Sequence, residues 1–91
     1  MEKMTIDEFF KLEDEKLLAI HPGNKKNSLA LRKAFDKKGY TWCTGEKYVG
    51  HSNYIRHKDE TCYDNTGRYA PIDFYKRNDY TIFEFEDVDL S

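Results

Sequence analysis

The hydrophobic positions of the first part of the chain predict a short helix followed by a buried strand. Residues 5–8, Thr-Ile-Asp-Glu, have the S/T-x-x-E form of a capping box, so a helix is expected from about Ile6 to Leu12. Leu17–Ile20 is a continuous apolar run that Pro22 and Gly23 end. Its length and its terminator favour a central strand buried on both faces over another helix.

A second helix and a second strand are expected next. Asn27 or Ser28 can cap a helix that ends near Lys38, with Gly39 in the left-handed position after it. Residues 40–44 alternate between larger and smaller side chains, which predicts a strand. The order strand, helix, strand predicts a right-handed βαβ crossover whose two strands are parallel.

The remaining pattern predicts a hairpin and a closing strand. Residues 61–64 and 68–72 flank Asn65-Thr66-Gly67, a plausible hairpin turn, and Tyr80–Glu86 is expected to be the last strand. A long loop runs from Gly45 to about residue 59. The fold class predicted is therefore α+β, a single small domain with a mixed four- or five-stranded sheet, two helices on one face and a βαβ unit.

Length and composition narrow the class of protein. The chain has 91 residues, of which 38% are hydrophobic and 35% are charged, as in a small, highly polar domain. It has no apolar run near 18 residues, and its acidic start does not resemble a signal peptide. We therefore expect a cytoplasmic protein without a membrane partner, in which Cys43 and Cys62 are reduced.

The aromatic residues are divided between two parts of the chain. All seven tyrosines and the single tryptophan lie between residues 40 and 80, whereas five of the six phenylalanines lie outside this segment. Tyrosine and tryptophan combine an apolar body with a polar group, which suits a surface that contacts a ligand or a partner. If the thiols of Cys43 and Cys62 face the helices, strand alternation turns Trp42 and Tyr63 outward.

These aromatic residues and nearby arginines form the predicted binding site. Aromatic rings stack on bases, and arginine makes bidentate contacts with phosphate or carboxylate. The alternative is that several of the rings cover the second face of the sheet. For Trp42, packing in the core is slightly favoured over ligand contact, whereas contact is favoured for the loop residues Tyr48 and Tyr54. The predicted ligand- or partner-binding residues are Trp42, Tyr48, Tyr54, Arg56, Tyr63, Arg68 and Tyr69.

Two patterns of polar residues suggest chemistry only weakly. Cys43, His51, His57 and Cys62 could surround zinc, but they include no C-x-x-C or H-x-x-x-H pair, so no bound metal is expected. Asp59 and Glu60 with the two histidines could form an acid–base or metal-hydrolase cluster, although nothing in this segment predicts a rigid scaffold. The expectation is a protein that is not an enzyme and that needs no cofactor.

The charges are segregated along the chain despite a net charge of −2. Residues 16–39 carry seven basic residues and one acidic residue, whereas both ends are acidic. The helix at 25–38 could follow the phosphates of a nucleic acid, but the acidic ends argue against tight binding to a duplex. The basic residues concerned are Lys25, Lys26, Arg32, Lys33, Lys37 and Lys38.

The segment Gly39-Tyr40-Thr41-Trp42-Cys43-Thr44-Gly45 resembles a group of small uncharacterised proteins from phages and prophages of low-GC Gram-positive bacteria. Residues 60–63 and 80–88 resemble further parts of the same pattern. The resemblance implies a small phage accessory protein that acts in the cytoplasm of a bacterial host, often as a non-enzymatic interference factor. It brings no catalytic residues to carry over.

Taken together, these features predict a non-enzymatic phage-encoded binding protein that inhibits a host process such as antiviral defence. Two mechanisms fit: sequestering a small anionic, nucleotide-like ligand, or docking on a host protein through the aromatic and arginine residues. One alternative is a nucleic-acid-binding regulatory protein that uses the basic helix. A small metal-dependent hydrolase is a weaker alternative.

Overall fold

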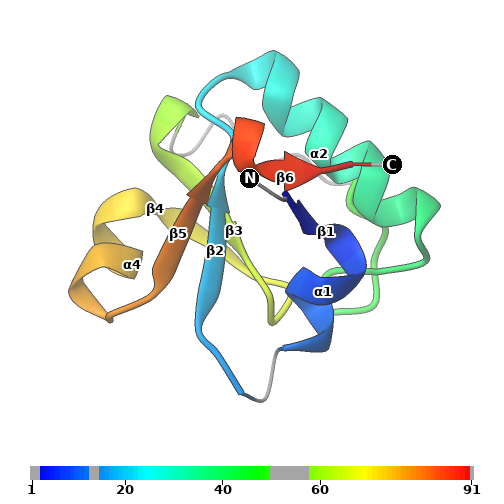
Figure 1. Cartoon of the computed structure of the whole chain (residues 1–91). Helices are drawn as coiled ribbons and strands as arrows, with labels where there is room; N and C mark the ends of the chain where they lie inside the picture. The colour runs from blue at the N-terminus through cyan, green and yellow to red at the C-terminus, as the bar shows by residue number, and fades with distance from the viewer. Residues whose placement is uncertain (1–2, 13–14, 50–57, 91) are drawn as a thin grey trace.

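The computed structural model describes residues 3–12, 15–49 and 58–90, and its centre is a four-stranded mixed sheet (Figure 1). The strands lie in the order β4 (Tyr69–Pro71), β3 (Thr61–Asp64), β2 (Leu18–His21) and β5 (Thr81–Glu84). β2 pairs antiparallel with β3 and parallel with β5, and β3 pairs antiparallel with β4. The predicted α+β class and the mixed sheet are confirmed.

β2 is the central strand that its apolar sequence predicted. Leu18, Ala19 and Ile20 are all buried, because β2 has a neighbour on each side and side chains packed on each face. The continuous apolar run is explained by this position, since both alternating sets of side chains need an apolar environment. The prediction for this strand is confirmed.

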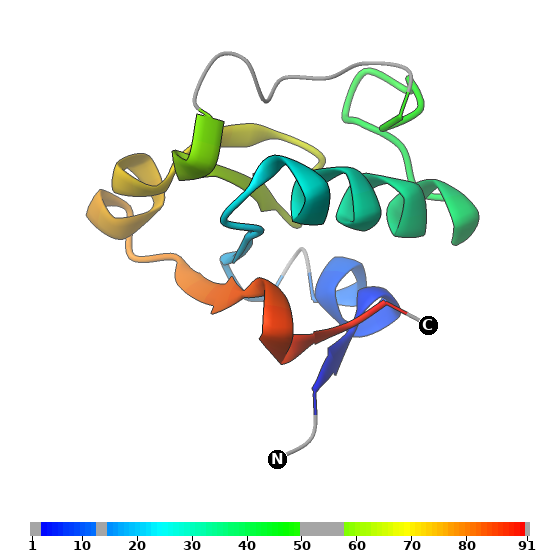
Figure 2. The ribbon, with the colours of Figure 1, turned by 90° about the horizontal axis from the view of Figure 1, so that it is seen from above.

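The first helix, α1 (Ile6–Lys11), begins where the capping box predicted. The Thr5 side chain accepts a hydrogen bond from the backbone N–H of Glu8 at 3.1 Å, which satisfies one of the free donors of the first turn. Just before the helix, β1 (Met4–Thr5) pairs in parallel with β6 (Val88–Asp89). Figure 2 shows this pair beside α1, so the two ends of the described chain meet there.

The second helix, α2 (Lys25–Lys37), begins one turn earlier than predicted. Its cap is Asn24, whose side chain accepts from the backbone N–H of Asn27 at 2.8 Å. The expected cap at Asn27 or Ser28 is therefore wrong, because the cap position three residues upstream already satisfies that N–H group. The predicted helix end is confirmed, since Gly39 follows with φ of 88°.

Residues 40–44 do not form the predicted strand. The backbone turns back on itself there: the N–H of Gly45 donates to Trp42 O at 2.8 Å, and the N–H of Trp42 donates to Glu46 O at 2.9 Å. The parallel neighbour of β2 is instead β5, with Leu18 opposite Thr81. The predicted crossover to residues 40–44 is wrong because a strand much later in the chain pairs with that side of β2.

Helices cover both faces of the sheet. α1 and α2 share one core cluster with Leu18, Ile20 and Tyr63 of the sheet, so the prediction of two helices on one face is confirmed. On the opposite face, a short helix that the sequence pattern did not reveal, α4 (Ile72–Arg77), covers Ala19 and Cys62 with Tyr75. In Figure 1, α4 lies to the left of the sheet and the other two helices lie to the right.

Two 3₁₀ turns complete the described part, η1 (Lys58–Glu60) before β3 and η2 (Phe85–Asp87) after β5. The predicted hairpin is confirmed, since β3 and β4 are antiparallel around residues 65–67. The radius of gyration is 11.8 Å, close to the roughly 12 Å expected for a compact domain of this length. No helix among the described residues is long and apolar enough to cross a membrane.

Candidate functional site

Several of the aromatic residues predicted to bind a ligand belong to the protein core. Tyr48 and Tyr63 are fully buried, and Trp42 is only 5% exposed. The slight preference for Trp42 in the core is confirmed, whereas the contact role favoured for Tyr48 is wrong because its side chain is enclosed by the core. The outward orientation that strand alternation gave Tyr63 is also wrong, because Tyr63 points toward α2 while Cys62 lies on the opposite face of the sheet. Tyr54 and Arg56 lie outside the described residues.

The structure nevertheless brings four of the predicted residues together around Trp42. The ring centroid of Trp42 lies 4.3 Å from Tyr48, 5.7 Å from Tyr63 and 5.8 Å from Tyr69. Tyr48 and Tyr63 lie on the buried side, whereas Tyr69 is partly exposed on the edge strand β4. The aromatic cluster thus extends from the core to the surface, and Trp42 and Tyr69 form its outer part.

Burial keeps the inner tyrosines neutral. It raises the pKa of Tyr48 and of Tyr63, with nearby Asp64 adding to the effect at Tyr48 and a hydrogen bond from Ser28 opposing it at Tyr63. The Ser28 and Tyr63 hydroxyl oxygens are 2.6 Å apart in the core. These phenols therefore remain protonated near neutral pH and pack as core side chains.

Asp64 organises the hairpin turn beside this cluster. One carboxylate oxygen, Oδ1, accepts from the backbone N–H of Thr66 at 3.0 Å, from its hydroxyl at 2.7 Å and from the backbone N–H of Arg68 at 3.1 Å. The other oxygen accepts from the Tyr75 hydroxyl at 2.8 Å. Asp64 is buried but has four donors, so its charge is well satisfied and fixes the turn.

The turn lies directly against the loop that carries Trp42. The backbone N–H of Cys43 donates to Gly67 O at 2.9 Å. A Cβ atom at Gly67 would lie 2.7 Å from the Cys43 nitrogen, so only glycine allows this approach. Gly67 also has φ of 83°, a conformation that favours glycine. This contact holds the two segments together.

A surface hollow of about 300 Å³ lies where the loop and the turn meet. We call it the Arg68 hollow. Its walls include three predicted residues, Trp42, Arg68 and Tyr69. Four further residues line it, of which only Cys43 had been considered, as a weak candidate zinc ligand. They are Cys43, Thr44, Glu46 and Gly67.

The Arg68 side chain extends from this turn into solvent. Its backbone N–H is fixed by Asp64, but no hydrogen bond or ion pair engages its guanidinium group within the part of the chain that the structure describes. Arg68 and Tyr69 also line a second hollow of about 300 Å³, together with Phe74, Tyr75 and Tyr80. Burial and the charge of Asp64 raise the pKa of Tyr80, and the nearby charge of Arg68 opposes this rise. Arg68 thus lines two hollows with aromatic walls.

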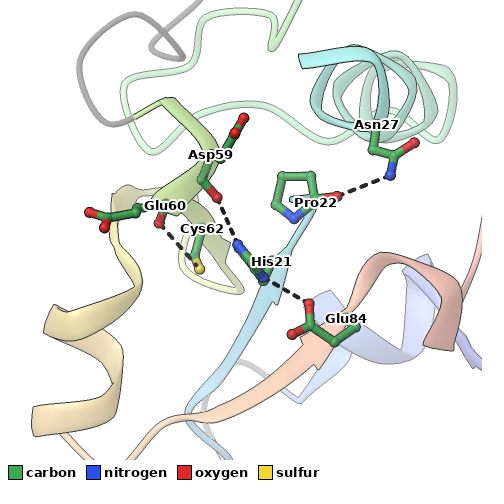
Figure 3. Close-up of polar contacts among 7 residues, drawn as sticks. All are labelled: His21, Pro22, Asn27, Asp59, Glu60, Cys62 and Glu84. Carbon is green, nitrogen blue, oxygen red and sulfur yellow. Dashed lines mark hydrogen bonds and ion pairs between the residues drawn. The ribbon is translucent and has the colours of Figure 1, made fainter. Parts of the chain in front are cut away.

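A separate polar cluster surrounds His21 at the end of β2 (Figure 3). Nδ1 of His21 is 2.8 Å from Oε2 of Glu84 on β5, and Nε2 is 2.7 Å from the Asp59 carbonyl oxygen on η1. Because a carbonyl oxygen can only accept, the Nε2–H group must donate to it. Both ring nitrogens are engaged, so His21 connects three segments of the fold.

The neighbouring thiol does not turn this cluster into a nucleophilic site. Burial raises the pKa of Cys62 to about 12, and its thiol points toward the Glu60 carbonyl oxygen at 3.8 Å, as Figure 3 shows. A thiol with such a high pKa contains almost no thiolate near pH 7. Asp59 and Glu60, predicted members of an acid–base cluster, are exposed on η1, and their proposed partners His51 and His57 lie outside the described residues.

The weak metal and nucleic-acid patterns gain no support. Cys43 is exposed and Cys62 is buried, and no group of three or more metal-ligating side chains occurs within residues 3–12, 15–49 and 58–90. The absence of zinc stays a prediction. On α2, Arg32 is buried and Lys38 approaches Asp7 at 3.8 Å, so two of the six basic residues have internal contacts.

Comparison of the chain with protein-family models, curated proteins and solved structures finds no match.

Proposed function

We propose that the protein is a non-enzymatic binding protein that holds a small anionic ligand at the Arg68 hollow. The observation that carries the proposal is the exposed Arg68 beside aromatic walls, with a guanidinium group that no side chain of the described residues engages. The backbone that carries Arg68 is fixed by the bonds of Asp64 to the hairpin turn. A positively charged group on a fixed backbone is suited to bidentate contact with phosphate or carboxylate.

The walls of the hollow favour a ligand with a flat part. Trp42 and Tyr69 present aromatic surface, and Trp42 is held from behind by Tyr48 at 4.3 Å. A ring that is already packed loses little freedom when a ligand binds, which lowers the entropic cost of association. The volume of about 300 Å³ lies at the lower end of the range for small-molecule sites.

Glu46 limits the kind of anion that fits. Its side chain lines the same hollow, so a second negative group of the ligand placed there would be repelled. A carboxylate also accepts hydrogen bonds from N–H groups. The ligand that suits both charged residues has one anionic group for Arg68 and a flat part with hydrogen-bond donors for Glu46, as a nucleotide has.

The biological role in this proposal is inhibition of a host process such as antiviral defence, in the cytoplasm of a bacterial host. It is supported by the resemblance of residues 39–45 to small phage proteins. Expression of the chain in a bacterium with an active defence system is expected to restore phage plaques. The Arg68→Gln variant, expressed to the same level, is expected not to restore them. If this variant restored plaques as well as the wild-type chain, inhibition of the defence system would not depend on the Arg68 hollow.

The binding proposal is tested with purified protein. Isothermal titration calorimetry with nucleoside monophosphates is expected to show binding that Arg68→Gln weakens by about tenfold or more. Arg68→Lys is expected to weaken it less, because lysine keeps the positive charge but lacks the planar guanidinium that makes bidentate contacts. Lys33→Ala is the matched control, since Lys33 is exposed on α2 and distant in sequence from the hollow. Arg56 and Tyr54 remain predicted contacts, and alanine at either is expected to weaken binding.

Docking on a host protein is the competing outcome. If no small anion binds and a host protein is recovered with the wild-type chain but not with Arg68→Gln, the ligand proposal is wrong and the aromatic and arginine surface binds a protein instead. If Lys33→Ala and Lys37→Ala abolish binding while Arg68→Gln does not, the basic helix is the working surface and the nucleic-acid alternative is favoured.

A further inference from the structure

The two outer strands of the four-stranded sheet differ in how well they are protected against further pairing. β4 has three residues and contains Pro71, which has no backbone N–H group. β5 contains neither proline nor lysine. It pairs on one side with β2, and no other strand within residues 3–12, 15–49 and 58–90 pairs with its outer side. In Figure 1, β5 lies in front of β2 and no other labelled element crosses it. We call this outer side the β5 edge.

The register shows which backbone groups the β5 edge presents. The N–H of Thr81 donates to Leu17 O at 2.8 Å, so the backbone groups of Thr81 face β2. Because this direction alternates along a strand, Phe83 faces β2 as well, and the N–H groups of Ile82 and Glu84 face the opposite way. The C=O of Ile82 points in the same direction as its N–H. An extended chain can therefore form hydrogen bonds along this edge, as in β-strand addition.

A hollow of about 510 Å³ lies beside this edge, on the face of the sheet that packs against α1. We call it the Phe83 hollow. Its apolar residues are Met4, Leu12, Leu18 and Phe83, and its exposed charged residues are Lys3, Glu8, Lys16 and Asp87. The two lysines and two acidic residues balance in charge, so the space between the apolar walls suits an apolar side chain. Side chains of directly paired residues point to the same face of a sheet. A residue paired with Phe83 would therefore place its side chain at this hollow.

The β5 edge and its continuation are acidic. Residues 78–89 contain five acidic residues and no basic residue. Glu84, Glu86 and Asp87 are exposed. Oε2 of Glu84 is 2.8 Å from Nδ1 of His21, and no hydrogen bond or ion pair among the described residues engages its Oε1. A second copy of the chain would bring two of these acidic segments together, whereas a basic segment would balance them.

We infer that the β5 edge binds an extended basic segment of another protein, which adds a strand to the sheet. An apolar side chain of that segment lies opposite Phe83 and enters the Phe83 hollow. The next residue points to the face covered by α4, where a lysine or arginine lies beside Glu84. Further basic residues of the segment approach Glu86 and Asp87. The Arg68 hollow and the Phe83 hollow share no residue, so this inference does not depend on the proposed function.

The first test uses the wild-type chain and short fluorescein-labelled peptides. The probe is a peptide in which valine alternates with lysine, and fluorescence anisotropy is expected to show that it binds. The same peptide with glutamate in place of lysine is expected not to bind. Two further versions carry N-methyl groups on the backbone of every lysine or of every valine, which keeps the charge but removes one set of N–H donors. One of these two is expected to bind about tenfold more weakly or worse, because its hydrogen bonds to the β5 edge are lost.

Hydrogen exchange locates the bound peptide without any substitution. Addition of the valine–lysine peptide is expected to slow the exchange of the amide protons of Ile82 and Glu84, which face outward in the free protein. The amide proton of Thr81 already bonds to β2 and serves as the internal reference.

Variants test the edge and its charge separately. Ile82→Pro removes an outward donor and is expected to weaken binding about tenfold, while the pairing with β2 is kept because this N–H does not face β2. The double variant Glu86→Gln, Asp87→Asn is expected to bind severalfold more weakly and with less dependence on salt. Asp73→Asn is the matched control, because it removes an acidic group at the start of α4, next to the opposite outer strand β4. Circular dichroism melting verifies that each variant is folded.

Three results would each show that the inference is wrong. The first is that the valine–lysine peptide does not bind, or that the glutamate peptide or both N-methylated peptides bind as tightly as it does. The second is that hydrogen exchange at Ile82 and Glu84 is unchanged when the peptide is bound. The third is that sedimentation shows a dimer that Ile82→Pro dissociates, in which case the β5 edge binds a second copy of the chain instead.

Discussion

At the scale of single residues, tyrosine is the side chain whose role the sequence could not decide. A tyrosine can face a ligand, or it can be buried if its hydroxyl finds a partner. Tyr63 meets Ser28, and Tyr75 meets Asp64. Ser28 is remote from Tyr63 in the chain, so no local pattern reveals that pairing. Arg68 could be predicted as exposed because it follows a hairpin turn.

The buried bond between Tyr75 and Asp64 makes a testable difference. Tyr75→Phe removes one donor from a buried carboxylate and is expected to lower the free energy of unfolding by about 1–3 kcal/mol. Tyr40→Phe is the matched control, because the Tyr40 hydroxyl donates at 2.9 Å to the exposed Asp7 and its loss is compensated by water. Urea denaturation measures both. Equal losses in the two variants would contradict the assigned role of Asp64.

At the scale of elements, most local signals were right, whereas the cap of α2 and the parallel partner of β2 were predicted wrongly. The cap at Thr5, the buried strand β2 and the turn at 65–67 were predicted because their causes lie within a few residues. The strand predicted at residues 40–44 was wrong. Five alternating residues are as compatible with a loop whose tryptophan packs inward as with a strand. The Arg68 hollow itself depends on a contact between loop and turn that no periodicity encodes.

The contact of the loop with the turn can be tested at Gly67. Gly67→Ala is expected to be strongly destabilising, because the new Cβ would lie 2.7 Å from the Cys43 nitrogen and because φ is 83°. Gly23→Ala is the control: Gly23 has φ of 87° but no atom within 4 Å of its Cβ position. The control is expected to lose about 1–2 kcal/mol from backbone strain alone, and Gly67→Ala more than that. Similar denaturation midpoints would show that the contact is looser than the structure indicates.

At the scale of the whole molecule, one sheet has two differently built faces. The face toward α1 and α2 is covered by a large cluster of aromatic and aliphatic side chains. The face toward α4 carries a smaller cluster of buried residues, which includes Cys62 and Tyr75. The chain has 91 residues, of which only 38% are hydrophobic even when tyrosine and cysteine are counted, and both residue types occur in these cores. The fold class could be predicted because periodicity and capping determine element types, whereas the burial of polar aromatics depends on the assembled molecule.

This use of titratable side chains in the core predicts alkaline instability. Burial raises the pKa of Cys62 from 9.0 to about 12, and raises the pKa values of Tyr48, Tyr63 and Tyr75 above 10.0. The folded protein therefore retains protons that the unfolded chain has lost. The resulting stability is fully present below pH 9 and declines as the pH rises toward the folded pKa values, by about 1.4 kcal/mol per pH unit for each group.

A single variant separates this effect from the loss of charge on exposed lysines in the same pH range. Tyr48→Phe removes a buried hydroxyl that has no hydrogen-bond partner among the residues that the structure describes, so it is expected to leave stability near pH 7 unchanged or slightly higher. Above pH 10 its free energy of unfolding is expected to fall less steeply than that of the wild-type chain, by about 1.4 kcal/mol per pH unit. Urea denaturation between pH 7 and 11.5 measures the slopes, and absorbance at 295 nm follows tyrosinate formation. If the free energy of unfolding fell with pH at the same slope in both proteins, Tyr48 would ionise as readily in the folded state as in the unfolded one. Its hydroxyl would then be open to solvent, in contradiction to its packing against Trp42.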